Sequence, residues 1–260
     1  MIDDVPVAMS PLAKLKRWLK LKVKPTTSIA GIKLPVHSSF STMMQDILYV
    51  GVYEQPELAL MAPQLRADDV VMEVGAGIGF LSAFCAKQIG SERVFAFEAN
   101  PIMESHIRKT YQLNKVKPTL QSGMLGAQAG EHVFYVAEHF WMSSTTQRDG
   151  ARPVQVPVYD VKTEMRRIKP TFLVMDIEGG EYELIKLIDF STINKCLIEV
   201  HHDLLSQEQI DEIHHILKIA GFSVISQAGA NNEVIYLARQ PAQVRPAQVQ
   251  PAQVQLTTTP

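Results

Sequence analysis

Three glycines at alternate positions follow a short apolar run, and this stretch most limits what the chain can fold into. Residues 70–74 read as a buried strand, Gly75, Gly77 and Gly79 follow, and residues 80–88 read as a helix. Glycine has no Cβ, so the backbone here can turn tightly and approach a nucleotide-like ligand. The spacing is G-x-G-x-G, whereas a dinucleotide fingerprint is G-x-G-x-x-G. The stretch predicts a strand, turn and helix that form a ligand site, with a tight turn that binds nothing as the alternative.

Length and composition are those of a globular protein. The chain has 260 residues, of which 46% are hydrophobic and 20% are charged, so it allows one large domain or two small ones and is long enough to bury a full core. A net charge of −2 gives the whole chain no attraction to nucleic acid or to a membrane, and we expect no nucleic-acid partner. Cys85 and Cys196 have no metal-ligand spacing and are expected to be reduced core residues. No apolar run has the length of a membrane span and no signal peptide is evident, so we expect a cytoplasmic protein.

The two ends of the chain differ from its middle. Residues 1–25 include a basic segment in which Leu12, Leu15, Trp18 and Leu19 follow helical spacing. We expect this helix to pack on its own domain, with contact to an anionic membrane surface or a partner protein as the alternative. Residues 241–260 continue a Pro-Ala-Gln-Val repeat, which predicts a disordered tail. The domain itself is expected to cover residues 26–240.

Strands and helices alternate along the domain, and this alternation predicts an α/β fold with a mostly parallel sheet. Asn100 and Pro101 are expected to open the helix that follows the second strand, as its N-cap and first residue. Ser206 and Gln209 form a capping box for the last helix, and Gly221 ends it. The further strands are expected at residues 93–98, 119–123, 171–176 and 195–200, two more around a polar loop at 132–136 and 154–158, and a terminal hairpin at 222–226 and 233–238.

An acid stands at the end of the second strand. Glu98 lies 19 residues after Gly79, where a carboxylate can accept both hydroxyls of a ribose. The alternative is that Glu98 caps the next helix, but Asn100 is already expected to serve as that cap. We therefore expect Glu98 to bind the ligand.

Charged residues also gather at the ends of two later strands. Asp176 and Glu178 follow one buried strand, and Glu199 and His201 end the next. Each pair is spaced by two residues, so its members point the same way in an extended chain. In an open α/β sheet, ligands bind at the edge formed by the carboxyl ends of the strands. The four side chains could hold a divalent cation, or position and deprotonate a hydroxyl. The alternative is that Asp176 caps a helix and His201 is an ordinary surface histidine.

Taken together, these motifs resemble the FkbM-type methyltransferases. The resemblance covers about residues 50–202, and its most specific mark is the Asp-x-Glu-Gly-x-Glu stretch at 176–181. Glu73 stands where the family usually has Asp, and Ala99 where it has Pro; Glu73 keeps the carboxylate. The other matching stretches are GVYE at 51–54, EVGAGIG at 73–79, VFAFEANP at 94–101, Asn114, the strand 156–158 before Asp160, and IEVH at 198–201.

The resemblance implies a Rossmann-like class I methyltransferase fold, with a seven-stranded sheet and a terminal antiparallel hairpin. It implies transfer of a methyl group from S-adenosylmethionine to a hydroxyl of a sugar, glycan or natural product. The catalytic residues are predicted to be Asp176, Glu178 and His201, with His201 as a neutral imidazole base. A divalent cation, if one binds, would use Asp176, Glu199 and His201. The predicted cofactor contacts are Glu73, Gly75, Gly77, Gly79, Glu98, Asn100, Ser122 and Asp176.

The sequence leaves two alternative functions open. A nicotinamide-dependent oxidoreductase would use a similar acid at Glu98, but the glycine spacing and the lack of a Tyr-x-x-x-Lys pair in a predicted helix argue against it. A non-catalytic nucleotide-binding scaffold is disfavoured by the strand-end carboxylates. Phe140, Trp141 and the hydroxyls of 143–146 lie in the irregular segment. That segment either covers a sugar-like acceptor or forms a solvated loop.

Overall fold

A computed structural model describes residues 10–23, 25–137, 139, 143–147 and 149–239. The predicted tail at 241–260 lies outside them, as do Phe140 and Trp141. Among the described helices, none combines the length and the apolar character that crossing a membrane requires.

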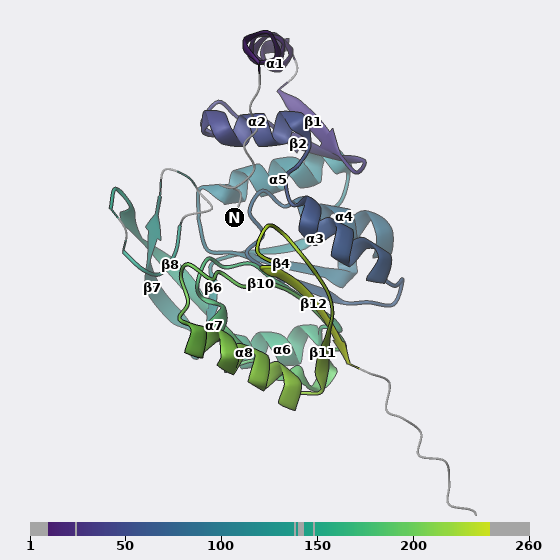
Figure 1. The fold of residues 1–260 in the computed structure, drawn as a ribbon, viewed down its shortest axis with the longest axis vertical. Coiled ribbons are helices and arrows are strands. Elements are labelled where there is room, and N and C mark those ends of the chain that lie inside the picture. Colours follow the sequence, from purple (N-terminus) through teal and green to yellow (C-terminus); the bar gives the residue numbers. More distant parts are fainter. Residues whose placement is uncertain (1–9, 24, 138, 140–142, 148, 240–260) are drawn as a thin grey trace, which may run out of the picture.

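A seven-stranded sheet forms the centre of the domain (Figure 1). Its strand order is β11-β12-β10-β9-β3-β4-β5. The five strands from β10 to β5 are parallel, and β12 runs antiparallel to both β10 and β11. The predicted class I methyltransferase architecture, a mostly parallel sheet with a terminal antiparallel hairpin, is confirmed. The strands are β3 Val71–Val74, β4 Val94–Glu98, β5 Thr119–Ser122, β9 Phe172–Met175, β10 Lys195–Glu199, β11 Phe222–Ala228 and β12 Val234–Arg239.

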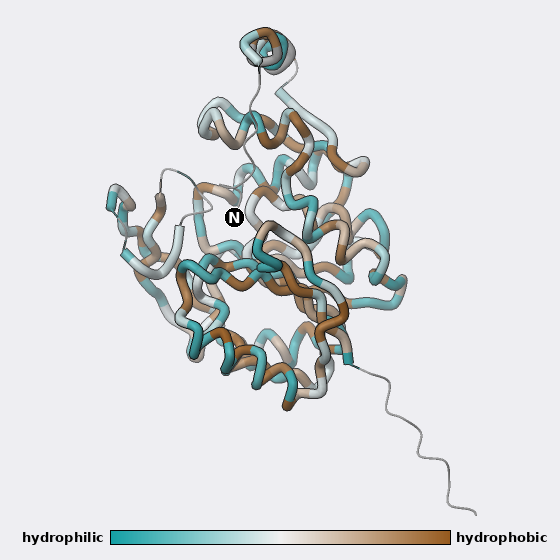
Figure 2. Tube along the Cα trace, viewed as in Figure 1, coloured by the Kyte–Doolittle hydropathy of each residue, from teal (hydrophilic) through white to brown (hydrophobic). Residues whose placement is uncertain are grey.

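Both faces of the sheet are covered by helices. Successive side chains of each strand point to opposite faces and therefore belong to two different core clusters. In β9, Phe172 and Val174 belong to one core cluster, whereas Leu173 and Met175 belong to the other. Figure 2 shows hydrophilic and hydrophobic residues alternating along α8, as expected of a helix with one buried face. The first cluster is covered by α3 Gln55–Met61, α4 Phe80–Ile89 and α5 Met103–Asn114, and the second by α6 Val161–Ile168, α7 Glu181–Ile185 and α8 Gln207–Ile219.

The register of the parallel strands aligns the residues at their carboxyl ends. Glu98 pairs with Ser122, and Phe97 pairs with Val74, which in turn pairs with Met175. Ile198 pairs with Met175 on the other side. The next residue along each of these strands therefore falls in one row across the sheet edge, which reads Ser122, Glu98, Gly75, Asp176 and Glu199.

A small second sheet stands beside this edge, in the segment where the alternation breaks (Figure 1). It has the order β6-β8-β7, with β6 parallel and β7 antiparallel to β8. A further bridge joins Tyr135 to Ser144. The two predicted strands are confirmed and the third, β6, was not expected. The strands are β6 Met124–Gly126, β7 Gly130–Val136 and β8 Arg152–Asp160.

Before the glycine-rich strand the chain forms elements that the sequence patterns do not predict. They are the hairpin β1 Thr26–Ile29 and β2 Ile32–Pro35, and the helix α2 Thr42–Val50. Ser41 caps α2 by accepting a hydrogen bond from the backbone N–H of Met44. Their buried residues join the core cluster on the α4 side.

Two helix predictions need correction. The first helix, α1 Pro11–Val23, forms as expected, but Leu12, Leu15, Trp18 and Leu19 are not buried on the domain, because they are 50–61% exposed. The helix α5 begins at Met103 with Ile102 as its N-cap, not at Pro101. The Asn100 side chain accepts a hydrogen bond from the N–H of Ile102, so it forms a turn before the helix. The capping box of Ser206 and Gln209 is confirmed, and Cys85 and Cys196 are buried thiols.

Candidate active site

The glycine turn after β3 packs directly on the backbone that follows β9. Gly75, Gly77 and Gly79 all have left-handed φ angles, of 88°, 55° and 75°. A Cβ on Gly75 would lie 1.6 Å from the backbone oxygen of Asp176. A side chain at this position would therefore separate the two strand ends, and glycine is required for the close approach.

Glu98 holds this turn in place. Its Oε2 accepts a hydrogen bond from the N–H of Gly77 (2.8 Å), and its Oε1 accepts one from the N–H of Asn100 (2.8 Å). Burial raises the pKa of Glu98 to about 7, and these hydrogen bonds partly offset that rise. The side-chain amide of Asn100 donates a hydrogen bond to the hydroxyl of Ser143 (3.4 Å). Glu98 thus links the glycine turn to the end of its own strand.

A cavity of about 440 Å³ opens at the carboxyl edge of the sheet, a size typical of cofactor and small-molecule sites. Gly75, Gly77, Glu98, Asp176 and Glu178 line it, so these predicted site residues come together. The second sheet and the segment between its strands β7 and β8 form another part of the wall, through Met124, Leu125, Phe134, Ser143, Thr145 and Thr146. Ser143, Thr145 and Thr146 belong to the segment that was expected either to cover an acceptor or to form a solvated loop, and in the structure these three residues line the cavity.

Other predicted cofactor residues lie near the cavity without lining it. Glu73 is buried beneath α4. Burial raises the pKa of Glu73 to about 8, and hydrogen bonds from Ser82 partly offset that rise. The hydroxyl of Ser122 donates to Oε2 of Glu104 (2.6 Å). The wall beside Ser122 is formed by the next residue, Gly123. Gly79 and Asn100 also lie outside the lining. Gly79 is the N-cap of α4, and Asn100 is hydrogen-bonded to Ser143, which does line the cavity.

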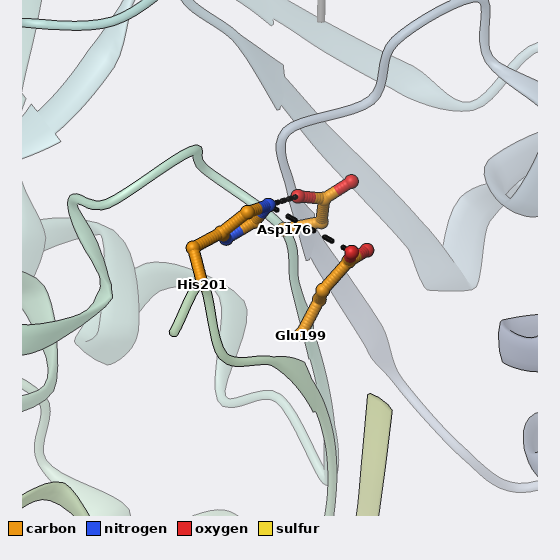
Figure 3. Close-up of side chains that lie close together, drawn as sticks. All are labelled: Asp176, Glu199 and His201. Carbon is orange, nitrogen blue, oxygen red and sulfur yellow. Dashed lines mark ion pairs between the residues drawn. The ribbon is translucent and has the colours of Figure 1, made fainter. Parts of the chain in front are cut away.

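The charged residues predicted at the ends of β9 and β10 do form one cluster. The Nε2 atom of His201 lies 3.6 Å from Oδ1 of Asp176, 3.4 Å from Oε2 of Glu178 and 3.7 Å from Oε1 of Glu199. Figure 3 shows the imidazole pointing at the carboxylates of Asp176 and Glu199. Glu178 has a φ of 54°, so this backbone is not extended. A turn, and not strand alternation, brings Asp176 and Glu178 to the same imidazole.

The charge state of this cluster follows from its crowding. Burial lowers the pKa of His201, but the surrounding carboxylates, Glu181 foremost, outweigh it and raise that pKa to about 10. Burial and the neighbouring charge of Glu199 raise the pKa of Asp176 well above its usual range. An imidazolium donates protons and accepts none, so the neutral imidazole expected at neutral pH is not what this environment favours.

Two further acids belong to the site, and the sequence patterns gave them no role. Glu181 has no exposed surface, and its Oε1 accepts hydrogen bonds from the N–H groups of Ile177 (3.3 Å) and Gly179 (3.2 Å). Glu54 lines the cavity with a strained φ of 48°, and its Oε2 accepts no hydrogen bond from the described residues. Both stand in the stretches that resemble the FkbM-type enzymes, which was the available signal.

Residues 73–224 match the Methyltransferase FkbM domain. The chain is 25% identical over 203 residues to the hexuronic acid methyltransferase AglP of Haloferax volcanii, a match that covers 73% of this chain and 82% of that protein.

Solved structures of methyltransferases also resemble it at low identity. The ribosomal protein L11 methylase of Lactobacillus delbrueckii subsp. bulgaricus is 15% identical with a TM-score of 0.45, over 74% of this chain and 82% of that one. The magnesium protoporphyrin IX methyltransferase of Synechocystis PCC 6803, solved with bound S-adenosylmethionine, is 14% identical with a TM-score of 0.45, over 87% and 91%.

The family match extends over more than half of the chain, from the glycine turn to the terminal hairpin. The chain therefore belongs to the FkbM methyltransferase family, and it is an S-adenosylmethionine-dependent methyltransferase. The nicotinamide-dependent oxidoreductase considered above is thereby set aside.

Proposed function

We propose that the protein transfers the methyl group of S-adenosylmethionine to a hydroxyl of a sugar, glycan or natural product. The observation that carries this proposal is the contact between Gly75 and Asp176 at the edge of the cavity. It brings the glycine turn, where a nucleoside can approach the backbone, next to a carboxylate that can receive a proton. Donor and acceptor would meet at this point.

The residues present fit the methyl donor. The cavity is lined by Glu54, Glu98, Asp176 and Glu178, and no lysine or arginine appears among the described lining residues. Oδ1 of Asp176 and Oε2 of Glu54 accept no hydrogen bond from the described chain. Buried carboxylate oxygens that accept no hydrogen bond favour a ligand that brings positive charge and N–H donors. S-adenosylmethionine supplies, when bound, an electrophilic methyl group on a positively charged sulfur and an ammonium group.

The proposed chemistry assigns each residue a task. Glu98 would hold the ribose hydroxyls while its hydrogen bond keeps Gly77 in the turn. Asp176 would orient the acceptor hydroxyl and accept its proton as the new carbon–oxygen bond forms and the carbon–sulfur bond breaks. A carboxylate with a raised pKa is a stronger base than an ordinary one. Glu178 lines the cavity beside it and would share in positioning the hydroxyl.

His201 acts as a positioning residue in this account. It is buried and does not line the cavity, so it has no direct path to the acceptor. Its Nε2 faces the carboxylates of Asp176, Glu178 and Glu199, and its Nδ1 is held by Glu181. The imidazolium would fix these carboxylates and limit their mutual repulsion.

The acceptor is proposed to be a neutral polyhydroxyl compound. Ser143, Thr145 and Thr146 offer hydroxyls on one wall, and Met124, Phe134 and Leu184 offer apolar surface, a combination that suits the two faces of a sugar ring. The relative from Haloferax volcanii is named for a hexuronic acid, which carries a carboxylate. The acidic lining described here favours an uncharged sugar over a uronate, because like charges repel.

A divalent cation is a second form of this proposal. Ligand atoms of Asp176, Glu199 and His201 lie within 4.8 Å of one another, and carboxylate oxygens with an imidazole form a suitable donor set for Mg²⁺ or Mn²⁺. A cation there would require neutral His201 and would lower the pKa of a bound hydroxyl directly. If turnover is abolished by a chelator and restored by Mg²⁺ or Mn²⁺, this form holds; unchanged turnover supports proton transfer to Asp176 alone.

Two measurements test the proposed function. Calorimetry should detect binding of S-adenosylhomocysteine and no comparable binding of NAD. Mass spectrometry of candidate acceptors incubated with S-adenosylmethionine should show the gain of one methyl group, with neutral sugars favoured over matched uronates. The absence of S-adenosylhomocysteine binding would contradict the proposal. A cytoplasmic location stays a prediction.

A further inference from the structure

The first helix exposes the apolar residues that it would bury if it served only to pack on the domain. Leu15, Trp18 and Leu19 are 50–52% exposed, Leu12 is 61% exposed and Val23 is 88% exposed. We call these five residues the α1 apolar face. Figure 1 shows α1 at one end of the molecule, beyond α2 and away from the central sheet.

A contact on the opposite side of the helix sets its orientation. The guanidinium of Arg17 forms an ion pair with Asp46 of α2 and donates a hydrogen bond to the backbone oxygen of Thr42 (3.3 Å). The side chains of this pair are only 12% and 10% exposed. At about 100° per residue, Leu15 and Leu19 each lie about 160° from Arg17 around the helix. The tether therefore turns the α1 apolar face outward.

The charge of the helix identifies the kind of surface that it fits. Residues 11–23 include Lys14, Lys16, Arg17, Lys20 and Lys22 and no acidic residue, although the whole chain has a net charge of −2. The ammonium of Lys22 lies 3.9 Å from the centre of the Trp18 ring. A short helix with leucines and a tryptophan on one side and lysines around them is typical of peptides that lie in the interface of an anionic bilayer.

We propose that α1 docks the protein on the surface of a membrane that contains anionic lipids, with its apolar face inserted among the lipid headgroups. A second copy of the chain would be a poor occupant of this face, because two such helices would bring their lysines together. The inference does not depend on the reaction catalysed, since α1 contributes no residue to the cavity lining.

Vesicle co-sedimentation of the full chain tests this proposal. We expect the protein to pellet with vesicles of phosphatidylcholine mixed with phosphatidylglycerol, and to stay in the supernatant with phosphatidylcholine alone. Leu15→Glu combined with Leu19→Glu should reduce the partition coefficient roughly tenfold or more, because two leucine side chains are then no longer buried. Lys16→Glu combined with Lys22→Glu should reduce binding to the anionic vesicles as well. Ile219→Glu is the matched control, since Ile219 is a 73% exposed residue on α8; it should bind like the wild type.

Tryptophan fluorescence provides a second measurement. The chain has two tryptophans, Trp18 and Trp141, so Trp141→Phe leaves Trp18 as the only one. Its emission should shift to shorter wavelength with anionic vesicles and stay unchanged with neutral ones. Equal binding to both vesicle types, no binding to either, or unaltered binding of the leucine variant would overturn the proposal. A dimer in gel filtration that Leu15→Glu dissociates would instead assign the α1 apolar face to a second copy.

Discussion

Nδ1 of His201 lies 2.9 Å from Oε1 of Glu181, a carboxylate with no exposed surface. This pair joins the end of β10 to the start of α7. The same carboxylate oxygen accepts the N–H groups of Ile177 and Gly179, so it also shapes the turn that carries Glu178. The imidazole is thereby held with Nε2 toward the strand-end carboxylates.

Glu181→Gln should therefore act through His201. The substitution replaces the carboxylate whose hydrogen bond contributes most to raising the His201 pKa, and it also removes a nearby negative charge. That pKa should therefore fall, as measured by NMR of the imidazole. We expect kcat to drop with little change in affinity for S-adenosylhomocysteine, and the pH profile of kcat to move with the imidazole. Glu208→Gln, an exposed change in α8, is the control. A purely structural role for Glu181 would lower stability and affinity together and leave the pH profile in place.

Gly75→Ala tests the contact between the two strand ends. The added Cβ would overlap the backbone oxygen of Asp176, which cannot move without shifting β9. Gly31→Ala is a matched control, because Gly31 has a similar φ of 79° and open space around it. That control should cost about 1–2 kcal/mol of unfolding free energy for the left-handed backbone alone. Gly75→Ala should cost clearly more and abolish binding of S-adenosylhomocysteine; equal losses would show that the contact is not required.

Glu98→Ala should weaken binding of S-adenosylhomocysteine in calorimetry. A lost charge-assisted hydrogen bond to the ribose corresponds to about 1.5–3 kcal/mol. The melting temperature should fall too, since the N–H groups of Gly77 and Asn100 lose their acceptor. Glu98→Gln keeps one acceptor oxygen, and its loss of affinity should be smaller. Unchanged affinity in both variants would remove Glu98 from the ribose site.

The pH dependence of stability should depend in part on Glu73. Its pKa rises from an ordinary value near 4.5 when unfolded to about 8 when folded, so the folded state holds the proton more tightly. Stability from this group is complete below the unfolded pKa and is lost as pH rises through the folded pKa. Chemical denaturation of the ligand-free protein between pH 5 and 8.5 should show this loss.

Glu73→Gln keeps the shape without the ionisation and should remove part of that loss, on the order of a few kcal/mol at the alkaline end. Glu131→Gln, an exposed change in β7, should leave the curve as it is. A Glu73→Gln variant with the pH dependence of the wild type would contradict the buried, protonated carboxyl.

The sequence predicted the parts of this fold that rest on local pattern. The buried runs before Gly75, Glu98 and Asp176 are short and apolar, and each is followed by a polar or glycine residue. That combination marks the carboxyl edge of a parallel sheet without any knowledge of strand order. The capping box of Ser206 and Gln209 is local in the same sense.

What escaped prediction depends on contacts between distant segments. The side chain of Asn100 donates a hydrogen bond to Ser143, which is 43 residues away in the sequence, and no local pattern predicts this contact. The buried carboxylate of Glu181 contacts His201, which follows the next strand of the sheet. The outward orientation of α1 is set by Arg17 meeting Asp46, and helical spacing alone cannot distinguish an outward apolar face from an inward one.

The most direct test of the central claim is Asp176→Asn, assayed for both binding and turnover. The substituted amide would keep the shape of the side chain and leave the backbone contact between residue 176 and Gly75 in place, but it could not accept the hydroxyl proton. We expect calorimetry to show that S-adenosylhomocysteine still binds, while the rate of methyl transfer measured by mass spectrometry falls by roughly 10²- to 10⁴-fold. An Asp176→Asn enzyme that binds S-adenosylhomocysteine and transfers methyl groups at the wild-type rate would contradict the account.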